Sequence, residues 1–217
     1  MIRFIKAVTI TLGLFVAVYV PAFAVTALLR PRIEVAIPLV IFISAGIAFA
    51  LILLFSKLSD DVGEFGLSVP CSKYVWLALA FGTPLGLITG WVTQLFPSVP
   101  PYDVSRFTVL MIVSYFVIGA SIQEEIIFRG LLQTMFQRIF NGSLIVIKLL
   151  VGYSVIAVAL LFGLIHLPEG LAVAFCALVL ALIAGELRKR SASIVPAIIV
   201  HMLFNAGSAA FAFPLRH

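Results

Sequence analysis

The chain has 217 residues, of which 63% are apolar or aromatic and only 11% are charged. Soluble domains carry about 45–50% apolar and about 25% charged residues. Composition therefore excludes a soluble enzyme, a disordered chain and, despite the net charge of +5, a nucleic-acid-binding domain. The sequence predicts an integral membrane protein.

Seven apolar runs are long enough to cross a bilayer, which takes about 20 helical residues. We expect every run to be a helix, because an open sheet cannot satisfy its backbone hydrogen bonds in lipid. The predicted fold is an all-α, polytopic transmembrane bundle. Its spans lie at roughly residues 4–29, 33–56, 74–96, 106–137, 145–166, 170–187 and 191–213.

Turn and helix-breaking residues separate the runs, for example Arg30-Pro31-Arg32 and Asn141-Gly142. Neither an internal repeat nor a soluble domain is evident in the sequence. We divide the chain into residues 1–105, with three spans and no motif, and residues 106–213, which contain every polar motif. Cys71 and Cys176 form neither a CxxC motif nor a disulfide framework and receive no role.

Basic residues mark the ends of the runs and do not form a patch for nucleic acid. Cytoplasmic loops carry an excess of lysine and arginine. With the N-terminus inside, nine flanking bases lie inside and four outside, which predicts an N-in/C-out topology. The inner bases are Arg3, Lys6, Lys57, Lys73, Arg138, Lys148, Arg188, Lys189 and Arg190, and the outer bases are Arg30, Arg32, Arg106 and Arg216.

The first run has two interpretations. Arg3 and Lys6, an apolar stretch and then Ala22-Phe23-Ala24 are typical of a signal peptide with an A-x-A cleavage site. The apolar run continues past that site to Leu29, which favours an uncleaved anchor helix.

Polar side chains interrupt three of the runs, where each ionisable group costs at least about 2.5–3.5 kcal/mol. Such groups are functional hypotheses by default. They are Glu124, Glu125 and Arg129 in the fourth run, His166, four residues after Phe162, in the fifth, and His201 and Asn205 in the seventh.

Helical spacing organises these groups. Glu125 and Arg129 share a helix face at i,i+4 and are expected to pair. Glu124 lies about 100° around the helix and is expected to face a different cavity, where it is a candidate general base. His201 and Asn205 present two hydrogen-bonding groups one turn apart.

A structural role is the alternative at each position. The Glu–Arg pair and the His–Asn pair can join helices, His166 can lie at the interface, and Phe162 can be core packing. Three further acids at span ends are expected to be solvated: Glu34, Glu169 and Glu186.

Depth limits the catalytic interpretation. At 1.5 Å per residue, Glu124, His166 and His201 lie roughly 21, 27 and 16 Å from the basic ends of their runs. They meet near the midplane only if the fourth helix continues for about 30 residues, tilted or broken. A helix that ended near Arg129 would separate Glu124 from His166.

The motifs EExxxR, FxxxH and HxxxN follow one another in apolar runs. This order resembles the CAAX protease and bacteriocin-processing (CPBP or Abi) family of intramembrane endopeptidases. The matching segments run from Glu124 to Arg129, from Phe162 to His166 and from His201 to Asn205. The resemblance covers roughly residues 106–210, with no departure at a motif position.

The resemblance implies hydrolysis of peptide bonds in membrane-associated peptides or proteins, in a bacterial or archaeal cell membrane. It implies that Glu124 and His166 activate the attacking water. The other implied roles are oxyanion stabilisation by His201 and Asn205, and support of the site by Glu125, Arg129 and Phe162.

Two questions about this activity stay open in the sequence. Glu124, His166 and His201 can supply three zinc ligands, yet HExxH is absent and a Glu/His base needs no metal, so we expect no obligatory cofactor. A CAAX substrate requires a prenylated cysteine, and leader peptides, signal peptides or membrane regulators fit equally well. The expected partners are this substrate and the lipid bilayer, and no nucleic acid.

Two other classes of function compete. One is a catalytically silent membrane scaffold or bacteriocin-immunity protein, against which the intact set of polar positions argues. The other is a small transporter that uses Glu124 and Glu125 as a proton relay. The lack of an inverted repeat disfavours the transporter.

Overall fold

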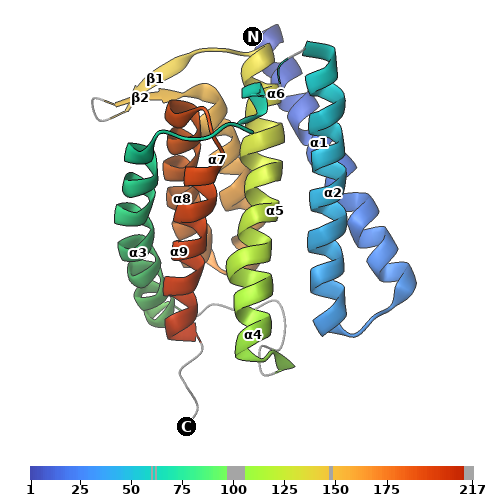
Figure 1. The fold of residues 1–217 in the computed structure, drawn as a ribbon, viewed down its shortest axis with the longest axis vertical. Coiled ribbons are helices and arrows are strands. Elements are labelled where there is room, and N and C mark those ends of the chain that lie inside the picture. The colour runs from blue at the N-terminus through green and yellow to red at the C-terminus, as the bar shows by residue number, and fades with distance from the viewer. Residues whose placement is uncertain (60, 62, 97–105, 147–148, 213–217) are drawn as a thin grey trace.

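The fold is that of a computed structural model, which describes residues 1–59, 61, 63–96, 106–146 and 149–212. Within these ranges seven helices form one bundle, and the start of α1 and the end of α9 lie at its opposite ends (Figure 1). The helices are α1 Ile2–Leu29, α2 Ile33–Ser59, α3 Ser72–Leu95, a continuous rod over Val109–Ile139, α7 Tyr153–Ile165, α8 Leu171–Ser191 and α9 Val195–Ala212.

Five of these helices are long and apolar enough to cross a bilayer: α1, α2, α3, the rod and α8. The other two, α7 and α9, are shorter apolar helices. The predicted helical architecture with seven apolar helices is therefore confirmed, apart from one hairpin. The orientation of the bundle in a membrane stays a prediction.

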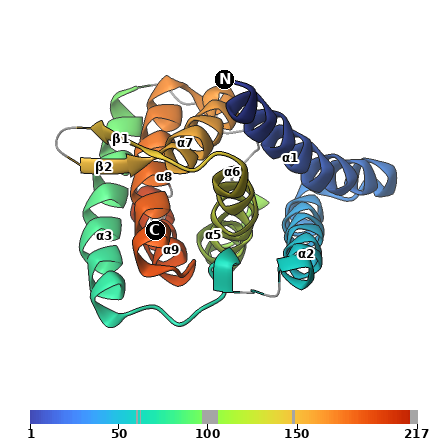
Figure 2. The same ribbon diagram turned by 90° about the horizontal axis from the view of Figure 1, so that it is seen from above.

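The hairpin corrects the prediction for residues 145–166. Strands β1 Ser143–Val146 and β2 Leu149–Gly152 pair antiparallel, with Val146 opposite Leu149, so this run is not helical throughout. Its apolar, partly β-branched sequence suits a strand as well as a helix, and periodicity cannot separate the two. The strands lie across one end of the bundle (Figure 2). Two bases of the topology argument, Lys148 and Arg216, lie outside the described residues.

The rod carries the first motif. It comprises α4 Val109–Met111, the π-helical segment η3 Ile112–Ala120, α5 Ser121–Glu125, the π-helical segment η4 Ile126–Leu132 and α6 Gln133–Ile139. Its 31 residues continue well past Arg129, as the depth argument requires. Segments of π-helix are rare and occur frequently at functional sites. Here they flank α5, which holds both glutamates.

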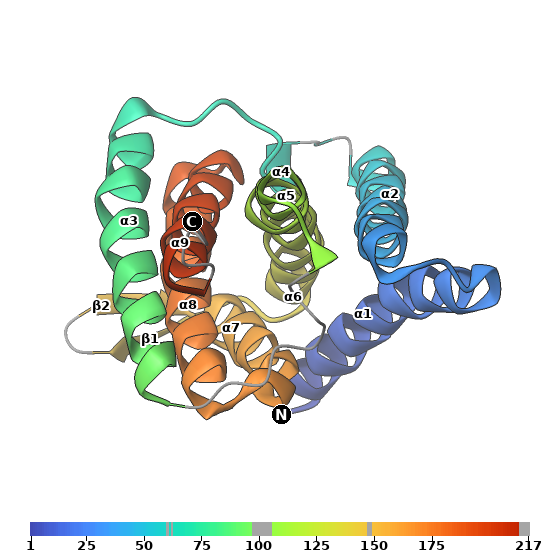
Figure 3. The same cartoon turned by 90° about the horizontal axis from the view of Figure 1, so that it is seen from below.

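The rod lies at the centre of the fold. Seen along the bundle, α1 and α2 lie on one side of it and α7, α8 and α9 on the other (Figures 2 and 3). Phe128, Leu131 and Leu132 of the rod are fully buried, as is Leu180 of α8. Burial of side chains this large makes the rod the core of the described structure.

Glycines bring α3 unusually close to α9. A Cβ atom on Gly86 would lie 2.6 Å from the Phe204 carbonyl oxygen, and one on Gly207 would lie 2.7 Å from the Gly86 carbonyl carbon. Small residues of this kind let helix backbones approach in membrane proteins. With α3 on one side, α9 lies between α3 and the rod (Figure 3), where its polar side chains meet α5.

Polar contacts fix α6, the C-terminal end of the rod. Arg138 of α6 donates to both carboxylate oxygens of Glu64, at 2.8 and 2.6 Å, and these bonds hold the pKa of Glu64 below its ordinary value. Arg188 of α8 donates to the Glu64 carbonyl oxygen and to Thr134 Oγ1. The loop after α2, the rod and α8 are thereby tied together.

Candidate active site

Three consecutive residues of α5 point in three directions, because successive side chains on a helix diverge by about 100°. Gln123 Nε2 donates to the Tyr19 hydroxyl of α1 at 3.0 Å and to Ser44 Oγ of α2 at 3.1 Å. Glu125 faces the opposite way, toward α9, and its side chain is completely buried. Glu124 lies between them and is 20% exposed.

Glu125 belongs to a buried charged cluster. Its Oε2 lies 3.1 Å from Arg129 Nε, the ion pair that the i,i+4 spacing predicts, and its Oε1 lies 2.8 Å from His201 Nδ1. Arg129 Nη2 also donates to the Ala181 carbonyl oxygen of α8 at 3.2 Å, and the guanidinium lies 5.1 Å from the centre of the Phe162 ring. Because burying a charge is costly unless it is paired and hydrogen-bonded, Glu125 is committed to this cluster.

His201 connects the cluster to Glu124. A carboxylate only accepts hydrogen bonds, so His201 Nδ1 carries a hydrogen toward Glu125. The other ring nitrogen, Nε2, lies 3.7 Å from Glu124 Oε2. When His201 is protonated, Glu125 stabilises the imidazolium, and Nε2 is a hydrogen-bond donor facing the space beside Glu124.

His166 follows the last residue of α7. Its Nδ1 lies 2.7 Å from the Phe162 carbonyl oxygen, which can only accept, so Nδ1 carries the hydrogen. In the neutral ring the Nε2 lone pair is then free to act as a base. The Phe162 ring lies between the two histidines, 4.6 Å from the His166 ring and 5.8 Å from the His201 ring. Phe162 therefore packs in the core and also positions both imidazoles.

Glu169 joins the site from the short helix η5, Leu167–Glu169. Its backbone N–H donates to the His166 carbonyl oxygen at 3.0 Å. Its carboxylate interacts electrostatically with both His166 and Glu124. Glu169 is thus linked electrostatically to both the glutamate of the first motif and the histidine of the second.

Asn205 is turned toward the rod. Its Nδ2 donates to the Phe116 carbonyl oxygen at 3.0 Å and to Ser121 Oγ at 3.1 Å. Both acceptors lie where the first π-helical segment meets α5. Because an amide nitrogen has two hydrogens, Asn205 stabilises a substrate oxyanion only by giving up one of these bonds. Its predicted role in the oxyanion hole stays a prediction.

A scan against protein families matches residues 106–207 to the family described as type II CAAX prenyl endopeptidase Rce1-like. These residues form an Rce1-like CAAX endopeptidase domain. The family is one of proteases, and together with five long apolar helices it identifies a multi-pass membrane protein. Searches of curated proteins and of solved structures found no match.

Glu124, His166 and His201, the three candidate zinc ligands, do not appear as a metal-binding group among the described residues. Among the described residues, no three side chains of His, Cys, Asp or Glu are grouped so that they could hold a metal ion. Imidazole and carboxylate suit zinc chemically, but Glu124, His166 and His201 do not converge as three ligands would.

Several residues around the candidate site were not predicted from the sequence. Gln123 could have been found from the sequence, because it is a polar residue directly before the two glutamates in an apolar run. Tyr19 could not, because an aromatic residue in an apolar run is ordinary. Pro168 after His166 is the signal for the turn that returns Glu169 to the site. Three acids expected to be solvated are instead half-buried: Glu34, Glu169 and Glu186.

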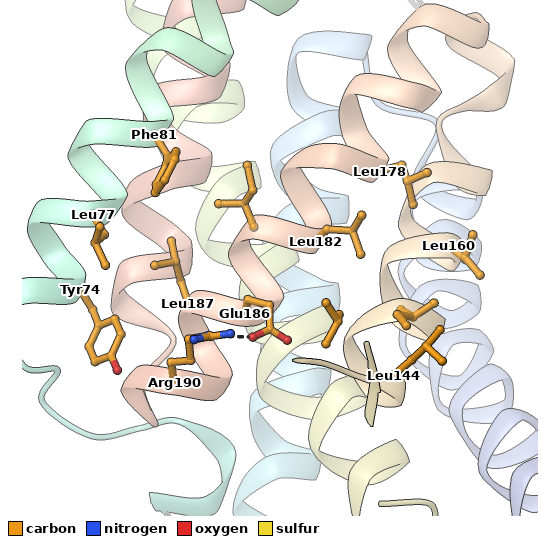
Figure 4. Close-up of a pocket in the computed structure, with 13 residues that line it drawn as sticks. Tyr74, Leu77, Phe81, Leu144, Leu160, Leu178, Leu182, Glu186, Leu187 and Arg190 are labelled. Atoms are coloured by element: carbon orange, nitrogen blue, oxygen red, sulfur yellow. Dashed lines mark hydrogen bonds and ion pairs between the residues drawn. The ribbon is translucent and has the colours of Figure 1, made fainter. Parts of the chain in front are cut away.

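An apolar cavity of about 680 Å³ lies between α3, α7, α8 and the hairpin (Figure 4), and we call it the second cavity because its lining is separate from the site around Glu124. Its walls are apolar side chains such as Phe81, Leu160 and Leu182. At one end Arg190 pairs with Glu186 at 2.9 Å (Figure 4). None of the motif residues lines this cavity.

Proposed function

We propose that the chain is an intramembrane endopeptidase that hydrolyses peptide bonds of membrane-associated peptides or proteins. The observation that carries the proposal is the separation of the two adjacent carboxylates. Glu125 is buried and paired with Arg129, while Glu124 is partly exposed and lies beside a histidine. The placement of Glu124 suits a group that exchanges protons with water.

The proposed reaction uses Glu124 as general base and then as general acid. Its carboxylate takes a proton from a water that His166 Nε2 orients, and the water oxygen bonds to the scissile carbonyl carbon. The carbonyl oxygen becomes an oxyanion, to which His201 donates from Nε2, with Asn205 as the second predicted donor. Glu124 then returns its proton to the leaving nitrogen as the carbon–nitrogen bond breaks.

The fixed orientation of the two histidines supports this chemistry. Hydrogen bonds from fixed groups stabilise developing charge more strongly where water is excluded. His201 is buried and held by Glu125, and His166 is held by the Phe162 carbonyl oxygen. Both rings are therefore oriented before substrate arrives.

We expect Glu124→Gln and His166→Ala each to lower cleavage at least about 100-fold, because each removes a group that activates water. The assay uses the full chain in detergent with a farnesylated peptide ending in a CAAX sequence, and with the same peptide lacking the prenyl group. Cleavage of one or both peptides shows the substrate class. Membrane and secreted peptides of cells that carry each variant are compared with those of wild-type cells.

The matched control for this assay is Glu186→Gln, which changes an acid beside the second cavity and should cleave at the wild-type rate. Full cleavage by both Glu124→Gln and His166→Ala would contradict the protease proposal. A cellular phenotype that persists in both variants would favour a scaffold or immunity protein.

We also propose that hydrolysis needs no obligatory metal, since a carboxylate and an imidazole suffice to activate water. Activity is expected to stay within about twofold after prolonged dialysis against a zinc chelator. Loss of activity that returns when zinc is added would contradict this expectation and favour Glu124, His166 and His201 as ligands.

An N-in/C-out topology is the final part of the proposal. The start of α1, the end of α6 and the hairpin lie at one end of the bundle, and α4 and the end of α9 lie at the other (Figure 1). Many of the basic residues counted as inner lie in segments at the first of these ends, an arrangement that follows the positive-inside rule.

The two native cysteines provide a direct test of topology. Cys71 is free and exposed in the loop before α3, and Cys176 is buried. A membrane-impermeant maleimide should label the protein in opened cells and leave it unlabelled in intact cells, and Cys71→Ser should abolish labelling. Strong labelling in intact cells would place this loop outside and reverse the topology.

A further inference from the structure

The N-terminal helices lie outside the family match, yet they contact α5 directly beside Glu124. Tyr19 of α1 and Ser44 of α2 both accept hydrogen bonds from Gln123, the residue directly before Glu124. Tyr19 is half-buried, and its ring packs against Phe15 with 4.7 Å between ring centres. The hydroxyl of Tyr19 is therefore held in place by both its ring and its oxygen.

The hydrogen of the Tyr19 hydroxyl is available. The oxygen accepts from Gln123 Nε2, and no acceptor for the hydroxyl hydrogen is found among the residues that the structure describes. Accepting one hydrogen bond polarises a hydroxyl and strengthens it as a donor. The hydroxyl of Tyr19 is thus a strengthened donor whose hydrogen has no acceptor among the described residues.

Through its bond with Gln123, this donor is held next to the residue that directly precedes Glu124 on α5. The charge of the Glu124 carboxylate acts on the Tyr19 hydroxyl, although the two groups are not hydrogen-bonded to each other in the structure. Glu124 thus has His201 of α9 at 3.7 Å, while Tyr19 of α1 is hydrogen-bonded to the residue directly before it.

The site also needs such a donor. Both amide hydrogens of Asn205 are already used within the protein, whereas His201 Nε2 is directed toward Glu124. Oxyanions in acyl transfer are typically stabilised by more than one hydrogen-bond donor. A phenol is a neutral donor that needs no change of protonation to act at physiological pH.

We propose that the Tyr19 hydroxyl is a catalytic hydrogen-bond donor to the scissile carbonyl oxygen, acting opposite His201 as that oxygen becomes an oxyanion. This inference rests on the proposed protease function and adds to it a residue from α1. It also assigns a role to the contact between the N-terminal helices and α5. Gln123 holds the Tyr19 hydroxyl by a hydrogen bond, and Glu124 is the next residue along the helix.

The test is Tyr19→Phe in the full chain, with the farnesylated CAAX peptide as substrate. Loss of one oxyanion donor is expected to lower kcat about 100-fold and to leave KM within about twofold, because the interaction strengthens only in the transition state. Tyr74→Phe, which removes a hydroxyl beside the second cavity, is the matched control and should keep both constants. Because the substitution also removes the hydrogen bond from Gln123, the unfolding temperature of Tyr19→Phe should fall by no more than about 2–4 °C.

A second readout separates catalysis from structural support. A phosphinate analogue of the same peptide carries a tetrahedral centre with a charged oxygen, and it should bind Tyr19→Phe about 100-fold more weakly than the wild type. The unmodified peptide, measured against Glu124→Gln with and without Tyr19→Phe, should bind both proteins equally. A merely structural tyrosine would weaken both ligands together.

The outcomes distinguish this inference from the function on which it rests. Wild-type kcat in Tyr19→Phe, together with loss of cleavage in Glu124→Gln, would overturn the role of Tyr19 and leave the protease intact. A rise in KM with unchanged kcat would also overturn it. Wild-type cleavage by Glu124→Gln would instead overturn the protease function itself.

Discussion

The structure depends on a charged pair held where water is excluded. Glu125 and Arg129 lie 3.1 Å apart, both almost completely buried, and His201 closes the cluster at 2.8 Å from Glu125. In an apolar bundle these charges are tolerated only because each has a partner. Of the two adjacent carboxylates, Glu125 is not available to act on a substrate, because it pairs with both Arg129 and His201. Since neighbouring side chains on a helix diverge, the other carboxylate faces a different space.

The remaining helices position the groups around that carboxylate. Close contact at Gly86 and Gly207 places α3 against one side of α9, and Asn205 joins the other side of α9 to the rod. On the opposite side, Gln123 fixes the rod to α1 and α2. The direction of Glu124 is thus set by the contacts of its two neighbours, which explains how a partly exposed acid can be rigidly oriented.

Spacing along the chain was enough to predict the central relationships. The i,i+4 separation correctly predicted the Glu125–Arg129 pair, and the long apolar run predicted a rod that continues past Arg129. Both follow from local helical geometry, which a single sequence contains. The depth argument also identified the length of this helix as the condition for a single site.

Other features depend on information that local patterns lack. The hairpin over residues 143–152 has a composition that suits either helix or strand, so only its packing decides. Tyr19 is one aromatic residue in an apolar run, and its role arises from a contact with Gln123, more than a hundred positions away. The two bonds made by Asn205 likewise reflect how α9 meets the rod, which the HxxxN spacing does not specify.

The central claim is that Glu125 holds the fold together and that Glu124 does not. The most direct measurement is the free energy of unfolding of Glu125→Ala and of Glu124→Ala in the same mixed micelles. Removing Glu125 leaves Arg129 buried without its partner and should cost about 3–5 kcal/mol. Removing the partly exposed Glu124 should cost less than about 1 kcal/mol. Equal losses in the two variants, or a larger loss for Glu124→Ala, would contradict the account.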